Sequence, residues 1–198
     1  MKIVLASKSP RRRKMFEELK IEHSLWDGEV DESSVKEEIK NLSPRKQVEL
    51  LSKAKAEGCF DDIKDSGTLI IAADTIVALK SDILGKPKDD DDARKMLRSM
   101  SNTTHYVYFG VCAIYNGKTV TSSEKTKIKF RKITDKEIER YIETGEHKDK
   151  AGSYGIQEKG GYFVESVSGD INNVVGLPVL KLRNMIFKEF KIDIFDLD

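Results

Sequence analysis

The sequence predicts an α/β fold with a mixed, elongated sheet and flanking helices. Two observations lead to this prediction: apolar segments typical of strands alternate with amphipathic segments typical of helices, and a strong hairpin signal interrupts the alternation. Alternating elements favour parallel strands, whereas a hairpin joins antiparallel strands, so the sheet should contain both. A chain of 198 residues is long enough for one domain with two lobes.

The chain opens as a strand, a turn and a helix. Residues 2–6, which are apolar after Lys2, predict a short buried strand. Ser9 with Pro10 forms a favoured helix start, a cap followed by a proline at the first helical position. A second strand is expected over 21–26, and the acidic, serine-containing stretch 27–34 is expected to be a loop.

The same start signal recurs at Ser43, where a proline again follows the cap. Apolar residues at helical spacing then continue to about Gly58. The continuous apolar run 68–73 predicts a buried strand. The acidic run 89–92 should open the next helix, because carboxylates at a helix N-terminus interact favourably with the helix dipole.

A hairpin and a helix follow. Residues 105–115 and 120–130 have strand-like patterns, and the pair 116–117, Asn-Gly, is a strong signal for a tight turn between them. Thr134 and Glu137 have the spacing of a capping box, which predicts a helix directly after the hairpin.

Charge and cysteine content limit the possible function classes. The net charge of +1, from 35 basic and 34 acidic side chains, gives no global attraction for nucleic acid. No apolar stretch approaches the length of a membrane span, and no signal peptide is recognisable. Cys59 and Cys112 have no metal-ligand spacing, and we expect two buried free thiols, although the sequence alone leaves a disulfide open. We therefore expect a cytoplasmic protein without a membrane or nucleic-acid partner.

The segment SKSPRR is the first candidate site. It places backbone N–H groups at a helix start, where the dipole favours an anion, and Ser7 and Ser9 add hydroxyl donors. Arg11 and Arg12 supply guanidinium groups suited to phosphate oxygens. Because cations oppose the dipole at this end, the arrangement favours a phosphate site over a solvated basic turn. A nucleic-acid contact is another alternative, but no aromatic platform accompanies the arginines.

Asp74 and Lys55 are the second group of candidates. Asp74 follows the buried run 68–73, where a carboxylate is costly unless it is paired, hydrogen-bonded or metal-bound. An aspartate in this position can serve as a Mg²⁺ ligand or as a general base. The structural alternative is that Asp74 only caps a turn. Lys55 interrupts an apolar helical stripe, so it must snorkel, pair with an acid or reach into a cleft.

Two glycine-containing segments carry further candidates. In LGKP, Gly85 permits close backbone approach, and Lys86 is either a phosphate partner or a solvated surface lysine. The run 149–157 ends in Gln157, whose amide both donates and accepts hydrogen bonds and so suits the edge of a base. Alternatively, its glycines only form turns. Pro178 should start the last helix.

Taken together, these segments resemble a known family. Seven segments between Leu5 and Pro178 resemble, in the same order, those of the Maf family of nucleoside triphosphate pyrophosphatases. They are LASKSPRR, LLSKAKA, AADTIV, LGKP, THYVY, DKAGSYGIQ and VVGLP. Each block alone is weakly specific, but the series covers nearly the whole chain. The resemblance implies one two-lobed nucleotide pyrophosphatase domain over residues 1–198, with a fold similar to that of the inosine triphosphate pyrophosphatases and a cleft between the lobes. It also implies a homodimer and dependence on Mg²⁺ or Mn²⁺.

The resemblance also implies roles for individual residues. The implied catalytic and metal-binding residues are Asp74, Lys55 and Lys86 for catalysis, and Asp74 and Glu32 for the metal. The implied substrate-binding residues are Ser7, Ser9, Arg11, Arg12, Thr75 and Gln157. Thr75 and Gln157 are similar to the residues of the branch that prefers dTTP, UTP and modified pyrimidine nucleotides over 7-methyl-GTP. One departure is Asn102, which stands where the family commonly has glycine, and asparagine tolerates a left-handed turn almost as well.

The expected reaction is hydrolysis of a nucleoside triphosphate to the monophosphate and pyrophosphate, with Asp74 holding a metal ion or activating the attacking water. The alternative is a non-catalytic nucleotide-binding regulator of cell division or septum formation, which would use the same phosphate site without turnover. A nucleic-acid-binding module built on SPRRRK is a third hypothesis, which the nearly neutral charge disfavours.

Overall fold

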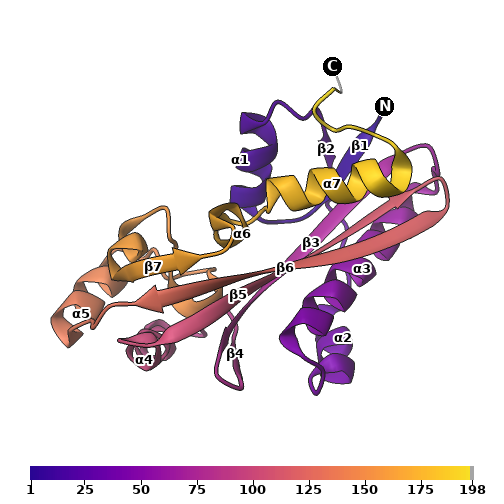
Figure 1. Cartoon of the computed structure of the whole chain (residues 1–198). Helices are drawn as coiled ribbons and strands as arrows, with labels where there is room; N and C mark the ends of the chain where they lie inside the picture. Colours follow the sequence, from indigo (N-terminus) through magenta and orange to yellow (C-terminus); the bar gives the residue numbers. More distant parts are fainter. Residues whose placement is uncertain (197–198) are drawn as a thin grey trace. The chain divides into compact units, whose positions relative to one another are not determined.

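The computed structural model describes residues 1–196, and it confirms an α/β fold with a mixed sheet and flanking helices. These residues form two compact units. The first contains residues 1–74, 109–124 and the chain from 176 onward, and the second contains residues 75–108 and 125–175. The long strands β3, β5 and β6 each contribute residues to both units (Figure 1).

The strands are β1 (Ile3–Ala6), β2 (Ser24–Leu25), β3 (Leu69–Leu79), β4 (Asp82–Leu84), β5 (Thr104–Tyr115), β6 (Lys118–Phe130) and β7 (Val164–Ser168). The helices are α1 (Pro10–Glu18), α2 (Glu32–Ile39), α3 (Pro44–Ile63), α4 (Asp90–Met100), α5 (Asp135–Glu143), α6 (Ile171–Val175) and α7 (Val179–Phe190). Two short 3-10 helices, Ala151–Ser153 and Lys159–Phe163, lie in the glycine-rich run.

The strands within residues 1–196 form a sheet in the order β2-β1-β3-β5-β6-β7, and β4 pairs with β3. β1 is parallel to both β2 and β3, whereas the β3–β4 and β6–β7 pairs are antiparallel. The predicted tight turn joins β5 to β6: Asn116 and Gly117 have φ values of 48° and 72°, as the favoured two-residue hairpin turn requires. The expectation of parallel and antiparallel strands in one sheet is therefore confirmed.

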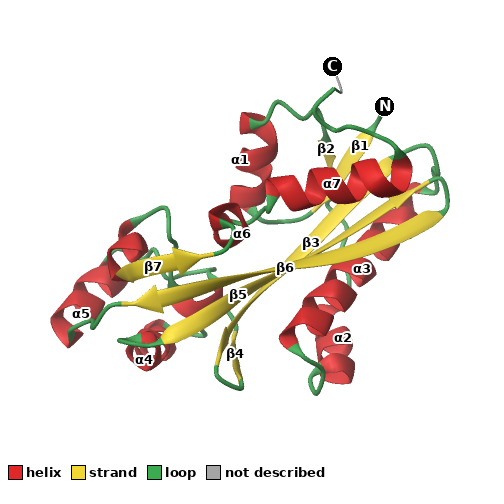
Figure 2. Cartoon of the chain, viewed as in Figure 1, coloured by secondary structure: helices red, strands yellow, loops and turns green. Residues whose placement is uncertain are grey.

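Strand residues of the first unit alternate between two buried faces. Figure 2 shows α3 on one side of these strands and α1 with α7 on the other. The cluster on the α3 side consists of Val4, Ala6, Ala56, Cys59, Ile70, Ala72, Cys112 and Ile114. Its two cysteines are buried free thiols, as predicted. This packing holds α3, and with it Lys55, against the strand that carries Asp74.

The backbone of α3 comes very close to β5 at Gly110. A Cβ atom built there would lie 2.1 Å from the carbonyl oxygen of Val48, a distance that no real contact allows. We expect Gly110→Ala to lower the free energy of unfolding by about 3 kcal/mol, because the helix must move to admit one methyl group. Urea unfolding of the variant measures this loss. Gly85→Ala is the matched control, since its Cβ would meet nothing within 4 Å, and an equal loss in both variants would contradict the prediction.

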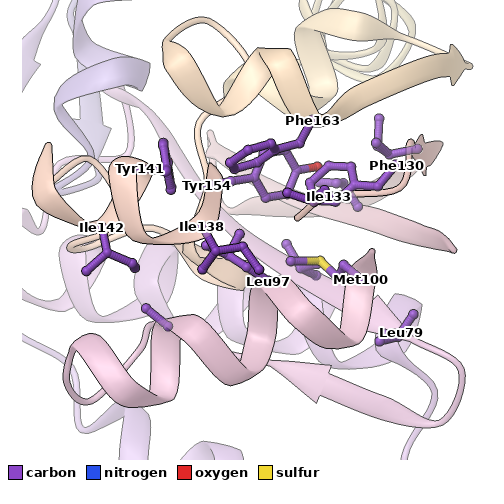
Figure 3. Close-up of a cluster of buried hydrophobic side chains, with 14 residues drawn as sticks. Leu79, Leu97, Met100, Phe130, Ile133, Ile138, Tyr141, Ile142, Tyr154 and Phe163 are labelled. Atoms are coloured by element: carbon purple, nitrogen blue, oxygen red, sulfur yellow. The ribbon is translucent and has the colours of Figure 1, made fainter. Parts of the chain in front are cut away.

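The second unit has its own apolar core between the helices α4 and α5 and the strands (Figure 3). His105 belongs to this core. Its ring packs edge-on against Phe130 with centroids 4.7 Å apart, and its Nε2 lies 2.8 Å from the hydroxyl of Tyr154. Burial lowers the pKa of His105 to about 4, so the ring is neutral at pH 7 and acts as a packing residue.

Two expectations about the first half of the chain are wrong in part. The stretch 27–34 is not entirely a loop, because α2 begins at Glu32. Asp31 caps this helix, and its carboxylate accepts hydrogen bonds from the backbone N–H groups of Ser33 and Ser34. The second strand is also shorter than 21–26, since only Ser24–Leu25 pairs with β1.

The strand that carries Asp74 extends further than expected. β3 continues to Leu79, so Asp74 lies in the middle of the strand and not at its end. The residues after Asp74 remain apolar, and their pairing with β4 keeps the backbone extended. Asn102 adopts the expected left-handed conformation, with φ 55°. No helix within residues 1–196 is long and apolar enough to cross a membrane.

Candidate functional site

The turn between β1 and α1 is held in shape by hydrogen bonds of its own serines. Ser9 caps α1 and accepts from the backbone N–H of Arg12, and Pro10 occupies the start of the helix, as predicted. The hydroxyl oxygen of Ser7 accepts from the backbone N–H of Ser9 at 3.3 Å and from Nη1 of Arg12. The helix start therefore has an ordered loop in front of it, the arrangement that binds anions in other proteins.

The two arginines of this turn have different environments. Arg11 is partly exposed, whereas Arg12 is only 5% exposed. The Arg12 guanidinium donates from Nε to the carbonyl oxygen of Gly176 at 3.0 Å and from Nη1 to that of Ala73 at 3.5 Å. It also lies over the ring of Phe109, 5.2 Å from the centroid. Burial lowers the pKa of Arg12 to about 10, and the nearby charge of Asp74 opposes this shift, so Arg12 stays cationic at pH 7.

Lys55 joins the two predicted metal-binding carboxylates. Its Nζ lies 2.6 Å from Oδ1 of Asp74 and 3.0 Å from Oε1 of Glu32. Among the three outcomes considered for Lys55, pairing with an acid is the one observed. The side chains of Lys55 and Asp74 are 17% and 14% exposed, so this ion pair is mostly shielded from solvent.

Glu32 is the more exposed member of this group and has a second partner. Lys36, one turn along α2, lies 2.8 Å from its other carboxylate oxygen. Burial raises the pKa of Glu32, but the hydrogen bonds and charges of Lys36 and Lys55 outweigh burial and hold the pKa below its usual value. Glu32 is therefore ionised at pH 7.

The donor set around Lys55 is suited to a hard divalent cation. Asp74 and Glu32 direct oxygens at the same point, the Nζ of Lys55, and Mg²⁺ is commonly bound by one or two carboxylates together with water and substrate phosphates. No group of three or more histidine, cysteine, aspartate or glutamate side chains that could hold a metal was found within residues 1–196. These two carboxylates fit a magnesium ion that is completed by ligands from outside the protein.

The remaining predicted site residues belong to the second unit. Thr75 directly follows Asp74 in β3, and Gln157 is exposed. Lys86 lies 3.5 Å from Oδ1 of Asp149, and both of these side chains are exposed. The segments that carry them, LGKP and DKAGSYGIQ, are tied together by a backbone hydrogen bond from Gly152 to the carbonyl oxygen of Gly85, 3.0 Å long.

The structure thus sorts the predicted residues into two groups. The first unit contains Ser7, Ser9, Arg11, Arg12, Glu32, Lys55 and Asp74, and the second contains Thr75, Lys86 and Gln157. Sequence reasoning missed the residues that contact these groups, namely Phe109 and the carbonyl of Gly176 beside Arg12, and Asp149 beside Lys86. Asp149 and Gly176 lie in glycine-containing motifs that had been singled out, but nothing in those motifs indicates a partner. The catalytic and binding roles themselves remain predictions.

Known proteins resemble this chain along nearly its whole length. A family model described as Maf-like protein matches residues 2–189. A protein of Pyrococcus furiosus named dTTP/UTP pyrophosphatase is 46% identical over 93% of this chain and 94% of its own. Proteins of the same name from Thermosipho africanus and Alkaliphilus metalliredigens are 44% and 43% identical over 98% of this chain and 96% and 98% of their own.

Among solved structures, the Ham1 protein of Staphylococcus aureus aligns with a TM-score of 0.47 at 15% identity, covering 66% of this chain and 72% of its own. The family match and the identity to full-length relatives agree with the order of motifs in the sequence. The chain belongs to the Maf-like protein family.

Proposed function

We propose that this protein hydrolyses dTTP and UTP to the nucleoside monophosphate and pyrophosphate. The observation that carries the proposal is the group formed by Lys55, Asp74 and Glu32, in the same unit as the capped turn Ser7–Arg12. Relatives above 40% identical that are named dTTP/UTP pyrophosphatase support the same reaction and substrate pair. Thr75 and Gln157 are the residues we assign to pyrimidine preference.

In the proposed reaction, a water oxygen bonds to the α-phosphorus and the bond from that phosphorus to the bridging oxygen breaks. Pyrophosphate leaves with the bridging oxygen and its electron pair. The water proton passes to Asp74, which is the base, or to solvent. The Ser7–Ser9 turn, Arg11 and Lys86 bind the triphosphate, so positioning and charge neutralisation lower the barrier. Arg12 adds its positive charge beside Asp74.

We assign Asp74 and Glu32 as the residues that would hold Mg²⁺ or Mn²⁺. A divalent ion there would neutralise the developing charge on phosphate oxygens. Lys55 keeps the two carboxylates at a common point before substrate arrives. We further propose a cytoplasmic homodimer, and the buried free thiols of Cys59 and Cys112 suit a reducing compartment. Sedimentation of the purified protein measures the oligomeric state.

A pyrophosphate-release assay tests the proposed function. Purified protein is incubated with the standard and modified nucleoside triphosphates, with and without Mg²⁺ or Mn²⁺. We expect metal-dependent release of pyrophosphate and monophosphate from UTP and dTTP. Tight nucleotide binding without release across the whole panel would instead support a non-catalytic regulator.

A further inference from the structure

Gly176 has a backbone conformation that few residues other than glycine adopt. It follows α6 directly, and its φ is 139°. Its carbonyl oxygen accepts the hydrogen bond from Nε of Arg12, 3.0 Å away. Because Arg12 is 5% exposed, this bond is shielded from water and holds one edge of a buried guanidinium group.

The other edge of the same guanidinium points toward the candidate site. Nη1 of Arg12 donates to the hydroxyl of Ser7 and to the carbonyl of Ala73, the residue before Asp74. A guanidinium group is planar, and its donors form a rigid fork. Fixing Nε therefore fixes the direction in which Nη1 points.

We propose that Gly176 is a positioning residue of the phosphate site, and that its carbonyl orients Arg12 so that the Ser7–Arg12 turn is held against the strand that carries Asp74. The inference rests on the proposed function, in which this turn binds the triphosphate. Arg12 is then a support for the turn, and the partly exposed Arg11 is the arginine that meets phosphate oxygens.

Gly176→Ala tests the inference. A Cβ at this position would meet nothing within 4 Å, so the variant avoids a clash but strains the backbone and turns the carbonyl away from Arg12. We expect the Kd for a non-hydrolysable UTP analogue, measured by calorimetry, to rise about tenfold, and the KM for UTP to rise equally. A rise of this size corresponds to a free-energy cost at the low end of the range for a strained backbone conformation. A purely structural defect would lower the fraction of active protein and leave both constants unchanged.

Gly145→Ala is the matched control. Gly145 also has a positive φ, 74°, and open space around its Cβ position, but it lies at the end of α5. We expect it to lose stability without any change in Kd. An unchanged Kd in folded Gly176→Ala, or an equal rise in both variants, would overturn the inference.

A second variant shows whether Gly176 acts through Arg12. Arg12→Lys keeps a positive charge near Asp74 but has no Nε donor for the Gly176 carbonyl, so it should raise the Kd on its own. Adding Gly176→Ala to this variant should change the Kd less than twofold, and fully additive effects would contradict the coupling. Wild-type protein that binds the analogue without turning over UTP would refute the proposed function alone. A wild-type protein that does not bind would refute both.

Discussion

Replacing Asp74 with asparagine is expected to abolish turnover while the protein stays folded. In the wild-type protein, Nζ of Lys55 lies 2.6 Å from Oδ1 of Asp74. Asparagine has nearly the same shape and can still accept this hydrogen bond, so the packing around β3 should survive. It carries no negative charge and cannot take up a proton, whether Asp74 serves as base or as metal ligand. We expect kcat to fall about 1,000-fold or more, within the range found for general bases.

Asp62→Asn is the control for this variant, because it makes the same chemical change in the same unit. Asp62 is exposed to solvent and accepts a hydrogen bond from Trp26 Nε1, 2.9 Å away, which an amide oxygen also accepts. Its kcat for UTP should stay within twofold of wild type. A folded Asp74→Asn protein with a wild-type rate would remove Asp74 from the mechanism.

Much of the fold follows from local patterns that can be read in the chain. Three local patterns each act within a few residues: a proline after a serine cap, an Asn-Gly pair between apolar strands, and a capping box. The structure has a helix start or a hairpin turn at every place where one of them occurs. Local patterns fail where pairing decides the outcome. The apolar run 68–73 does not show that β3 continues to Leu79, because the partner strand β4 supports this extension.

The sequence predicts which residue types form the site, but it does not predict which of them contact one another. The sequence shows that Lys55 interrupts an apolar stripe, yet snorkelling, pairing and a cleft all satisfy that pattern. Only the register of α3 against β1 and β3 brings its Nζ to Asp74. The same holds for Arg12, whose neighbour Gly176 is 164 residues away in the chain. Contacts of this kind arise from the packing of whole elements, and no local spacing encodes them.

Replacing Lys55 with methionine is expected to change activity and metal binding in opposite directions. Methionine retains most of the length of the apolar stem but removes the cation that faces Asp74 and Glu32. The two carboxylates then lose their shared partner, and turnover of UTP should fall about 100-fold or more, as when a charge-stabilising group is removed from an active site.

In the absence of nucleotide, the same variant should bind Mg²⁺ about tenfold more tightly or better, because an ammonium group near the metal position repels a divalent ion. Calorimetric titration with MgCl₂ alone measures this Kd without relying on activity. The control is Lys53→Met on the same helix. This partly exposed lysine pairs with Glu57 3.5 Å away, and neither quantity should change. Partial unfolding would weaken both Mg²⁺ binding and UTP turnover. A gain in Mg²⁺ affinity together with a loss of turnover can therefore only come from freeing the two carboxylates. If Lys55→Met binds Mg²⁺ no better than wild type, then Asp74 and Glu32 do not form the metal site, and Lys55 pairs with them only to compensate their negative charge.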